Sequence, residues 1–332
     1  MKIGIKAGLV VTGTLAACSL LMSVFLVGGL SESDASSVLA GRPSRHFALY
    51  LPQNKTAYFS DIMNGALKSA SENGAALSVH ALDQSGDALK MAAYSGLDGI
   101  VVCPDLDDEV IFKSLSFLTA NGVPLVLVNH NIPAEQPWPF VGTNNFDLGR
   151  KVAQLITTLD RGDLRLAIVY SDKSPAIFAE RELVEMGVHA VLSRKLSGPI
   201  QSFRTDLNPR DAEKVTYRIV RSMPEVNVIV FTDLNDTLAG TQALIDLNLV
   251  GRIHVIGFGG DQTIVDSIKK GIITGSIVVN PSLMGYQSVR SLSELSASGY
   301  TSTSVDTGID VISQENLYAW RSAFDRKAGD GK

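Results

Sequence analysis

Cysteine is scarce in this chain of 332 residues, which contains only Cys18 and Cys103. Cys18 falls inside an apolar N-terminal run, so we expect no disulfide to Cys103, which we expect to pack in a core. Zinc sites need cysteines or histidines at short, regular spacings, and no such spacing occurs. The sequence therefore predicts neither a disulfide framework nor a metal site.

Charge is also limited: charged residues make up 19% of the chain, and the net charge is −5. No basic stripe or low-complexity tract occurs, so the composition gives no electrostatic reason to bind nucleic acid. Hydrophobic residues, by contrast, make up 45%. A chain of this length forms one large or two medium domains, because single cores stop growing near ~250–300 residues.

Motifs of catalytic and cofactor sites are missing as well. A dinucleotide-binding loop needs G-x-G-x-x-G after a strand, but the stretch that begins with Gly257 has Gln262 in the sixth position. No Walker A segment, G-x-S-x-G elbow or HExxH motif occurs. The acidic run at residues 105–109 is typical of the first turn of a helix, where carboxylates complement the helix dipole. We therefore expect no catalytic residue, no cofactor and no metal.

The N-terminus has the composition of a membrane-targeting segment. Lys2 and Lys6 precede an uncharged apolar run at residues 7–30, and about 20 residues suffice to span a bilayer. Three interpretations remain open: an uncleaved signal-anchor, which the length of the run favours, a lipoprotein signal with lipidation at Cys18, or cleavage near residues 38–40. Each exports the rest of the chain, which begins with a polar tether at residues 31–44.

Short apolar runs alternate with helical patterns from residue 46 onward. Fully apolar strands that alternate with helices indicate parallel sheets covered on both faces, and two sheets fit the length better than one. Strands are expected at residues 46–51, 77–81, 99–102, 124–128, 164–170, 188–192, 226–231, 253–257 and 276–279. Helices are expected at residues 58–73, 87–94, 105–121, 146–159, 176–186, 209–222, 236–247, 261–270 and 282–298.

The stretch at residues 253–287 is the most informative. Its second strand stops at Asn280-Pro281, because proline cannot donate to a ladder. Gly257-Phe258, Asn280-Pro281, Met284-Gly285-Tyr286 and the closing VDTGIDVISQEN at residues 305–316 resemble the corresponding elements of type I periplasmic binding proteins. The resemblance covers roughly residues 46–316. It implies an α/β fold of two doubly wound parallel-sheet lobes joined by a multi-strand hinge.

The resemblance also implies how the chain divides. Residues 1–44 would form the signal-anchor and tether, and residues 321–332 a polar tail. The N-terminal lobe would comprise residues 45–143 and 280–306, and the C-terminal lobe residues 144–279 and 307–320. The ligand would lie between the lobes.

Candidate ligand-binding residues follow from the loops beyond the carboxyl ends of strands, where ligands bind in open α/β sheets. Tyr58-Phe59 match the aromatic pair that stacks on a sugar face in the family. Asn129-His130 stand where sugar-binding relatives commonly carry Asp-Arg, and Val279 replaces a glutamine, so several polar anchors differ. The candidate set is Thr56, Tyr58, Phe59, Asn129, His130, Arg181, Asp233, Asn235, Asp236, Phe258, Asp261 and Asn280.

By its resemblance, the protein is expected to bind a small solute outside the cytoplasm, anchored to the periplasmic side of the bacterial cell membrane. It would close around a small polar, sugar-like ligand and deliver it to an ABC importer. The alternative is a ligand-sensing subunit of a membrane histidine kinase or chemosensory system, which an uncleaved anchor would suit. A lactose-type repressor, which shares the core fold, is excluded, because the export segment stands where a DNA-binding helix-turn-helix would have to be.

Overall fold

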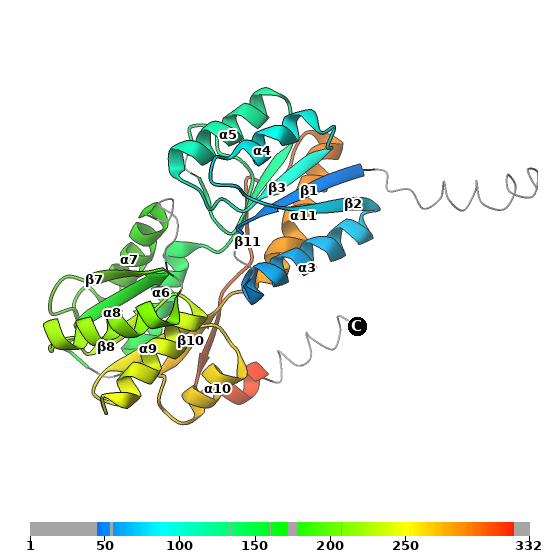
Figure 1. Cartoon of the computed structure of the whole chain (residues 1–332). Coiled ribbons are helices and arrows are strands. Elements are labelled where there is room, and N and C mark those ends of the chain that lie inside the picture. The colour runs from blue at the N-terminus through cyan, green and yellow to red at the C-terminus, as the bar shows by residue number, and fades with distance from the viewer. Residues whose placement is uncertain are drawn as a thin grey trace, which may run out of the picture. The chain divides into compact units, whose positions relative to one another are not determined.

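The computed structural model describes residues 45–53, 56–132, 134–159, 161–171, 178–206 and 208–321 (Figure 1). The predicted membrane segment at residues 7–30, Cys18, the tether and the tail after Arg321 lie outside the described residues. Within the described ranges, no helix is both long and apolar enough to cross a membrane. Arg45–Lys332 forms one compact unit.

The first half of this unit is built on a six-stranded sheet in which all neighbouring strands are parallel. Its strands, in the order β11-β5-β4-β3-β1-β2, are Ser304–Asp306, Phe140–Gly142, Leu125–Val128, Gly99–Val102, Arg45–Leu51 and Ala75–Ala81. Its helices are α3 (Ala57–Glu72), α4 (Asp87–Met91), η1 (Ala92–Tyr94), α5 (Asp108–Ala120) and α11 (Pro281–Ser298). Alternate residues of β1 point to opposite faces: Phe47 and Leu49 pack with α3 and α11, whereas Ala48 and Tyr50 pack with α4 and α5.

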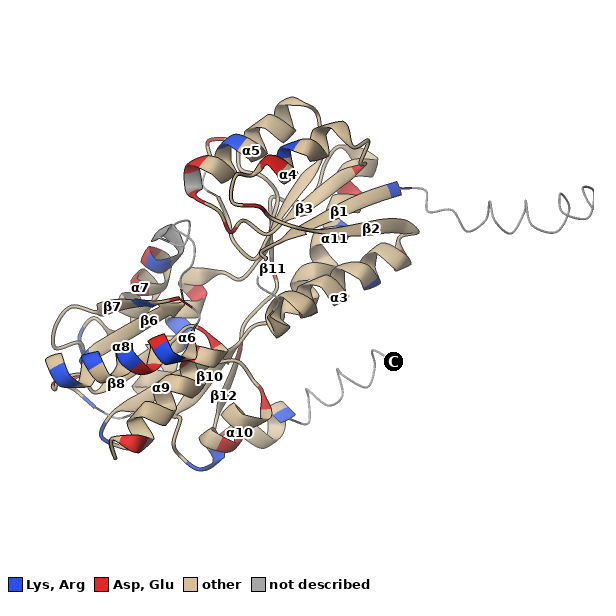
Figure 2. Ribbon diagram, viewed as in Figure 1, with Lys and Arg blue, Asp and Glu red and all other residues tan. Residues whose placement is uncertain are grey.

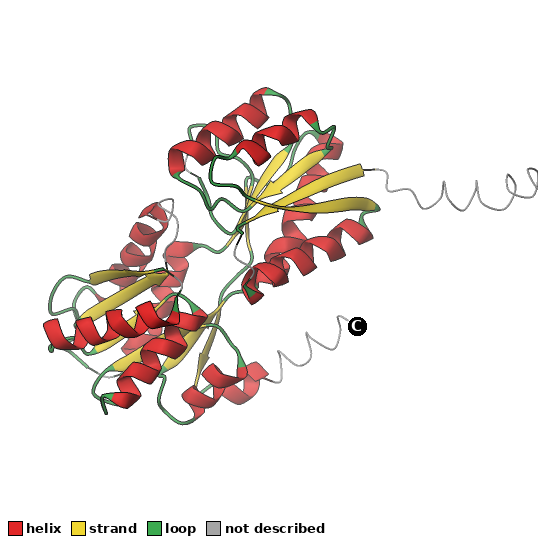
Figure 3. Cartoon of the chain, in the orientation of Figure 1, coloured by secondary structure: helices red, strands yellow, loops and turns green. Residues whose placement is uncertain are grey.

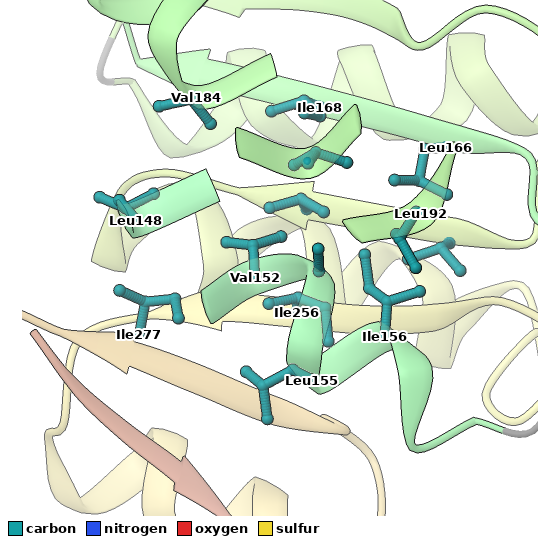
Figure 4. Close-up of a cluster of buried hydrophobic side chains, with 14 of the residues drawn as sticks. Leu148, Val152, Leu155, Ile156, Leu166, Ile168, Val184, Leu192, Ile256 and Ile277 are labelled. Carbon is teal, nitrogen blue, oxygen red and sulfur yellow. The ribbon is translucent and has the colours of Figure 1, made fainter. Parts of the chain in front are cut away.

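The second half repeats this arrangement on another six-stranded sheet (Figure 3). Its strands, in the order β12-β10-β9-β8-β6-β7, are Asp310–Ser313, Gly275–Val278, His254–Phe258, Val228–Phe231, Leu166–Ser171 and Gln201–Thr205, and only β12 is antiparallel. Its helices are α6 (Asn145–Thr157), α7 (Phe178–Leu192), α8 (Pro209–Ser222), α9 (Leu234–Asp246) and α10 (Gln262–Lys269). Helices α6 and α7 cover one face with the apolar cluster of Figure 4, and α8, α9 and α10 cover the other.

Charged side chains lie mainly on the helices and loops, while most strands are free of charge (Figure 2). This is the pattern expected of parallel strands that are buried on both faces. The predicted fold class, two doubly wound parallel-sheet lobes joined by several chain segments, is therefore confirmed.

The chain passes between the two sheets three times. It leaves β5 for α6 through Thr143-Asn144, returns from β10 to α11 through Val279-Asn280, and leaves β11 for β12 through residues 307–309. The closing segment at residues 305–316 contains this last crossing. The segment divides into two strands of different sheets, and Gly308 lies between them with a φ of +79°, which favours glycine.

Three elements differ from the sequence prediction. Residues 188–192, expected as a strand, are the last turn and a half of α7, because Val184, Val188 and Leu192 are buried at a helical spacing of four. The edge strand β7 was missed, since its sequence QSFRT is too polar to resemble a buried strand. The three-residue strand β5 was missed because it is short.

Each lobe contains a helix pair that approaches to backbone contact. In the first lobe, a Cβ added to Gly65 of α3 would lie 1.8 Å from the carbonyl oxygen of Ser282 on α11. In the second lobe, a Cβ added to Gly149 of α6 would lie 2.0 Å from the carbonyl oxygen of Val184 on α7. Only glycine permits such an approach, so these residues fix the spacing of helices whose first turns face the gap between the lobes.

We predict that Gly65→Ala destabilises the protein by at least ~1–3 kcal/mol, because the added methyl overlaps backbone that cannot move aside as a side chain could. Urea unfolding followed by circular dichroism measures this. Gly162→Ala is the matched control, since nothing lies within 4 Å of the methyl group it adds. Equal midpoints for the two variants would show that α3 and α11 are not in close contact.

Candidate functional site

A cavity of about 200 Å³ lies between the lobes at the carboxyl ends of both sheets. It is small beside the ~300–1,000 Å³ of sites for drug-sized ligands. Its lining combines apolar and aromatic side chains with hydrogen-bonding ones. The lining residues are Thr56, Tyr58, Phe59, Asp105, Asn129, His130, Thr143, Asn145, Leu148, Tyr170, Ser171, Arg181, Val184, Thr232, Asp233, Phe258 and Val279.

The first lobe contributes an ordered half of this cavity. The hydroxyl of Tyr58, the second residue of α3, donates to Oδ1 of Asn129 at 2.6 Å. Asn129 directly follows β4 and has a φ of +72°, a conformation that asparagine tolerates better than most residues. Thr56 caps α3 by accepting from the backbone N–H of Phe59 at 3.4 Å. These hydrogen bonds, all within the first lobe, hold the side chains that line this half of the cavity.

The second lobe contributes a cation stacked on a phenol. The Arg181 guanidinium carbon of α7 lies 5.2 Å from the ring centroid of Tyr170, at the end of β6, which is within the range of a cation–π contact. The Tyr170 hydroxyl lies 3.5 Å from Oε1 of Glu185, which also accepts from the Ser202 hydroxyl at 2.5 Å. Burial raises the pKa of the Tyr170 phenol above its ordinary value, and the negative charge of the nearby Glu185 carboxylate raises it further. The phenol therefore stays protonated.

Asp233 and Thr143 each have a side-chain oxygen that makes no hydrogen bond to the described residues. Asp233 caps α9, and Oδ1 accepts from the backbone N–H groups of Asn235 at 2.8 Å and Asp236 at 3.1 Å. Its other oxygen, Oδ2, has no hydrogen bond to the described residues. The Oγ1 of Thr143, in the first crossing segment, is buried without a hydrogen-bond partner in the described part of the chain. Buried polar atoms are nearly always paired, so Thr143 offers a place for a polar ligand. Asp233 is half-buried and lines the cavity, so its Oδ2 is available to a ligand as well.

The structure brings most of the predicted site residues together. Thr56, Tyr58, Phe59, Asn129, His130, Arg181, Asp233 and Phe258 all line the cavity. Four others lie outside its lining: Asn235, Asp236, Asp261 and Asn280. Asp261 and Asn280 cap α10 and α11, where they accept from the backbone N–H groups of Ile264 and Leu283 at 2.9 Å. Asn235 is exposed in the first turn of α9.

Several lining residues were not predicted, and most occupy one kind of position. Tyr170 and Ser171 end β6, Thr232 follows β8, Thr143 follows β5 and Asp105 follows β3. The rule that ligands bind beyond the carboxyl ends of strands would have found them if it had been applied to every strand. Asn144, next to Thr143, caps α6 by accepting from the backbone N–H groups of Phe146 and Asp147.

Comparison with known proteins decides the family. A family model described as "Periplasmic binding protein domain" matches residues 47–300, and the two-lobed architecture agrees with it. The chain belongs to the periplasmic binding protein family. Its type is type I, as the sequence predicted.

The relatives of this periplasmic binding protein have low sequence identity to it, but the matches cover most of each chain. The ribose import binding protein of Bacillus subtilis (strain 168) is 23% identical over 235 residues, covering 69% of this chain and 74% of the relative. A glucose-galactose binding protein from Geobacillus stearothermophilus superposes with a TM-score of 0.73 at 22% identity, covering 82% of this chain and 98% of that one. A solute-binding protein from Actinobacillus succinogenes 130z with bound D-allose gives 0.72 at 17% identity, covering 83% and 100%.

Membership has two consequences. Periplasmic binding proteins bind solutes and are not enzymes, in agreement with the prediction. They act outside the cytoplasm, so this part of the predicted location holds for the chain as well. The predicted N-terminal anchoring concerns residues outside the described ranges.

Asp236 is a buried carboxyl beside the site. It is fully buried in the first turn of α9, where the Thr205 hydroxyl donates to Oδ2, while Oδ1 has no partner among the described residues. Burial raises the pKa of Asp236 to about 7. The Thr205 hydrogen bond opposes the rise, and the carboxylates of Asp233, Asp211 and Asp206 add to it. The structure therefore gives Asp236 a place in the second lobe's interior rather than at the cavity.

We predict that the protein loses stability as pH rises from about 4 to about 7, because the folded state holds the Asp236 proton over that range and the unfolded state releases it at 3.8. The pKa difference corresponds to roughly 4 kcal/mol at most above pH 7. Asp236→Asn should therefore raise the thermal midpoint at pH 8 by several degrees and have much less effect at pH 4.5. The exposed Glu225 supplies the control variant Glu225→Gln. A gain for Asp236→Asn of the same size at both pH values would contradict the prediction.

Proposed function

We propose that this periplasmic binding protein binds a small sugar between its lobes and delivers it to an ABC importer. The observation that supports this most is the lining of the cavity, which mixes aromatic and aliphatic side chains with many hydrogen-bonding groups. A sugar has the matching chemistry, since its C–H faces are apolar and its hydroxyls both donate and accept. Relatives named for ribose, for glucose-galactose and for bound D-allose support the same class of ligand.

Each lobe offers complementary groups to such a ligand. In the second lobe, Oδ2 of Asp233 can accept from sugar hydroxyls and the Arg181 guanidinium can donate to them, as charge-assisted hydrogen bonds. In the first lobe, Asn129 and His130 stand beside the aromatic rings of Tyr58 and Phe59. A sugar that contacts both sets would stabilise a closed arrangement of the lobes around the hinge segments. Closure of this kind would let an importer distinguish the loaded protein from the empty one.

The importer is the proposed partner because the ribose relative is an import binding protein by name. A membrane histidine kinase as an alternative partner stays a prediction from the sequence. So does anchoring through residues 7–30, which would hold the protein close to either partner.

We predict that one of D-ribose, D-glucose, D-galactose or D-allose raises the thermal midpoint of the protein. A ligand that binds only the folded state at 100 times its dissociation constant adds about 2.7 kcal/mol, or roughly 4 °C for a protein of this size. Differential scanning fluorimetry at millimolar sugar measures the shift, and Asp233→Ala should reduce it. The exposed Asp246 gives the control variant Asp246→Asn. No shift with any of these sugars would contradict the sugar-binding proposal.

We predict opposite effects of Thr143→Val on stability and on sugar affinity. Valine has nearly the shape of threonine and removes a buried hydroxyl that has no partner among the described residues, so the sugar-free protein should be as stable as the wild type or more stable. If the sugar supplies the missing partner, its dissociation constant should rise by roughly 2- to 10-fold. Thermal unfolding and isothermal titration calorimetry measure the two quantities. A sugar affinity equal to that of the wild type would remove Thr143 from the site.

A further inference from the structure

The hydroxyl of Tyr58 donates a hydrogen bond to another residue of the cavity lining, Asn129. Among the contacts with described residues, this proton reaches Oδ1 of Asn129 at 2.6 Å and Sδ of Met284 at 3.5 Å. A thioether sulfur is a weak acceptor, and the shorter contact is with the amide oxygen. The Tyr58 proton therefore belongs to Asn129.

This bond determines which way the Asn129 amide points. An amide has one accepting oxygen and two donating N–H groups, and a hydroxyl proton can be accepted only by the oxygen. With Oδ1 turned to Tyr58, Nδ2 points to the other side, where its contact is Sγ of Cys103 at 3.9 Å. A sulfur at that distance is a poor acceptor. Nδ2 thus keeps donor capacity that no described residue uses well, and Asn129 is one of the residues that line the cavity.

The backbone of Asn129 is fixed as well. Its N–H donates to the carbonyl oxygen of Val141 at 2.9 Å, which holds the residue to β5 just past the end of β4. Its φ of +72° lies in the left-handed region, where a residue other than glycine costs free energy and occurs preferentially at functional sites. Backbone and side chain are therefore both set before any ligand arrives.

The Tyr58 ring is also held in place by the first lobe. It meets the Phe59 ring edge-on, with centroids 5.6 Å apart and planes at 90°. Its hydroxyl contacts reach β4 through Asn129 and α11 through Met284, which is 1% exposed. The ring and the hydroxyl are thus held by contacts within the first lobe.

We propose that Tyr58 is a positioning residue, whose hydroxyl orients Asn129 so that Nδ2 donates to an acceptor oxygen of the bound sugar. This rests on the proposed function and adds a specificity rule to it. An N–H group can donate to the ether oxygen of a sugar ring or glycosidic bond, which carries no proton, as readily as to a hydroxyl oxygen. A carboxylate in the place of the Asn129 amide could only accept, so it would require a sugar hydroxyl as donor. The first lobe therefore tolerates an ether oxygen at this point of the ligand.

The test uses single variants and a double-mutant cycle on the full chain, with titration calorimetry of the sugar that gives the largest thermal shift in the four-sugar panel. Tyr58→Phe keeps the ring and removes the hydroxyl. Asn129→Asp keeps a side-chain oxygen that can accept from Tyr58, and aspartate also tolerates a positive φ. The change removes the side-chain N–H donor. Tyr300→Phe is the control, because Tyr300 is exposed and lies outside the cavity lining.

Tyr58→Phe should weaken binding roughly 3- to 10-fold, as expected for loss of one hydrogen bond, and Asn129→Asp at least as much. The double variant should bind no more weakly than Asn129→Asp alone, since Tyr58 acts through the lost donor. Thermal midpoints without sugar, measured in parallel, show whether each variant folds. Wild-type affinity for Tyr58→Phe, or losses that multiply in the double variant, would overturn the proposal.

A second measurement needs no ligand and separates this inference from the proposed function. In ¹H–¹⁵N spectra of the sugar-free protein, the side-chain amide pair of Asn129 is assigned by its loss in Asn129→Asp. Tyr58→Phe should move that pair toward the shifts of a freely rotating amide. An unchanged pair would overturn the positioning role, whether or not a sugar binds. A panel without any binder would contradict the proposed function, and with it the donation from Nδ2 to a sugar.

Discussion

The direction of the strands is the constraint on which the rest of this structure depends. All strands of one sheet, and all but β12 of the other, run parallel, so every strand-to-helix loop of a lobe opens at the same edge. Three crossings of the chain connect the sheets and leave the two edges on opposite sides of one cavity. Residues that are far apart in sequence, such as Asn129 and Asp233, therefore line a single space.

Each wall of the cavity is ordered mainly by contacts within its own lobe. On one side the Tyr58 hydroxyl donates to the side-chain amide of Asn129, and on the other the Arg181 guanidinium stacks on the buried Tyr170 phenol. The glycines at the crossings of α3 with α11 and of α6 with α7 let these helices meet backbone to backbone. Because contacts within each lobe hold these side chains in the absence of ligand, the proposed binding of a sugar would cost little side-chain entropy.

Much of this could be predicted from sequence, for reasons that particular elements show. The apolar runs of β3 and β4 are buried on both faces, so composition alone indicates strands. The start of α8 was predicted at Pro209, which a helix accepts in its first turn. Edge strand β7 could not be found in this way, because a strand that is half exposed contains polar residues. The hydroxyl bond of Tyr58 was equally hidden, since its partner is distant in the sequence and only the folded sheet brings them together.

A crystal structure grown with the sugar that stabilises the protein most would test the central claim directly. The account predicts one sugar molecule in the cavity, with hydrogen bonds from Asn129 on one lobe and from Asp233 or Arg181 on the other. It also predicts that the two sheets move closer together about the three hinge segments. A sugar bound to one lobe alone, or anywhere outside this cavity, would contradict it.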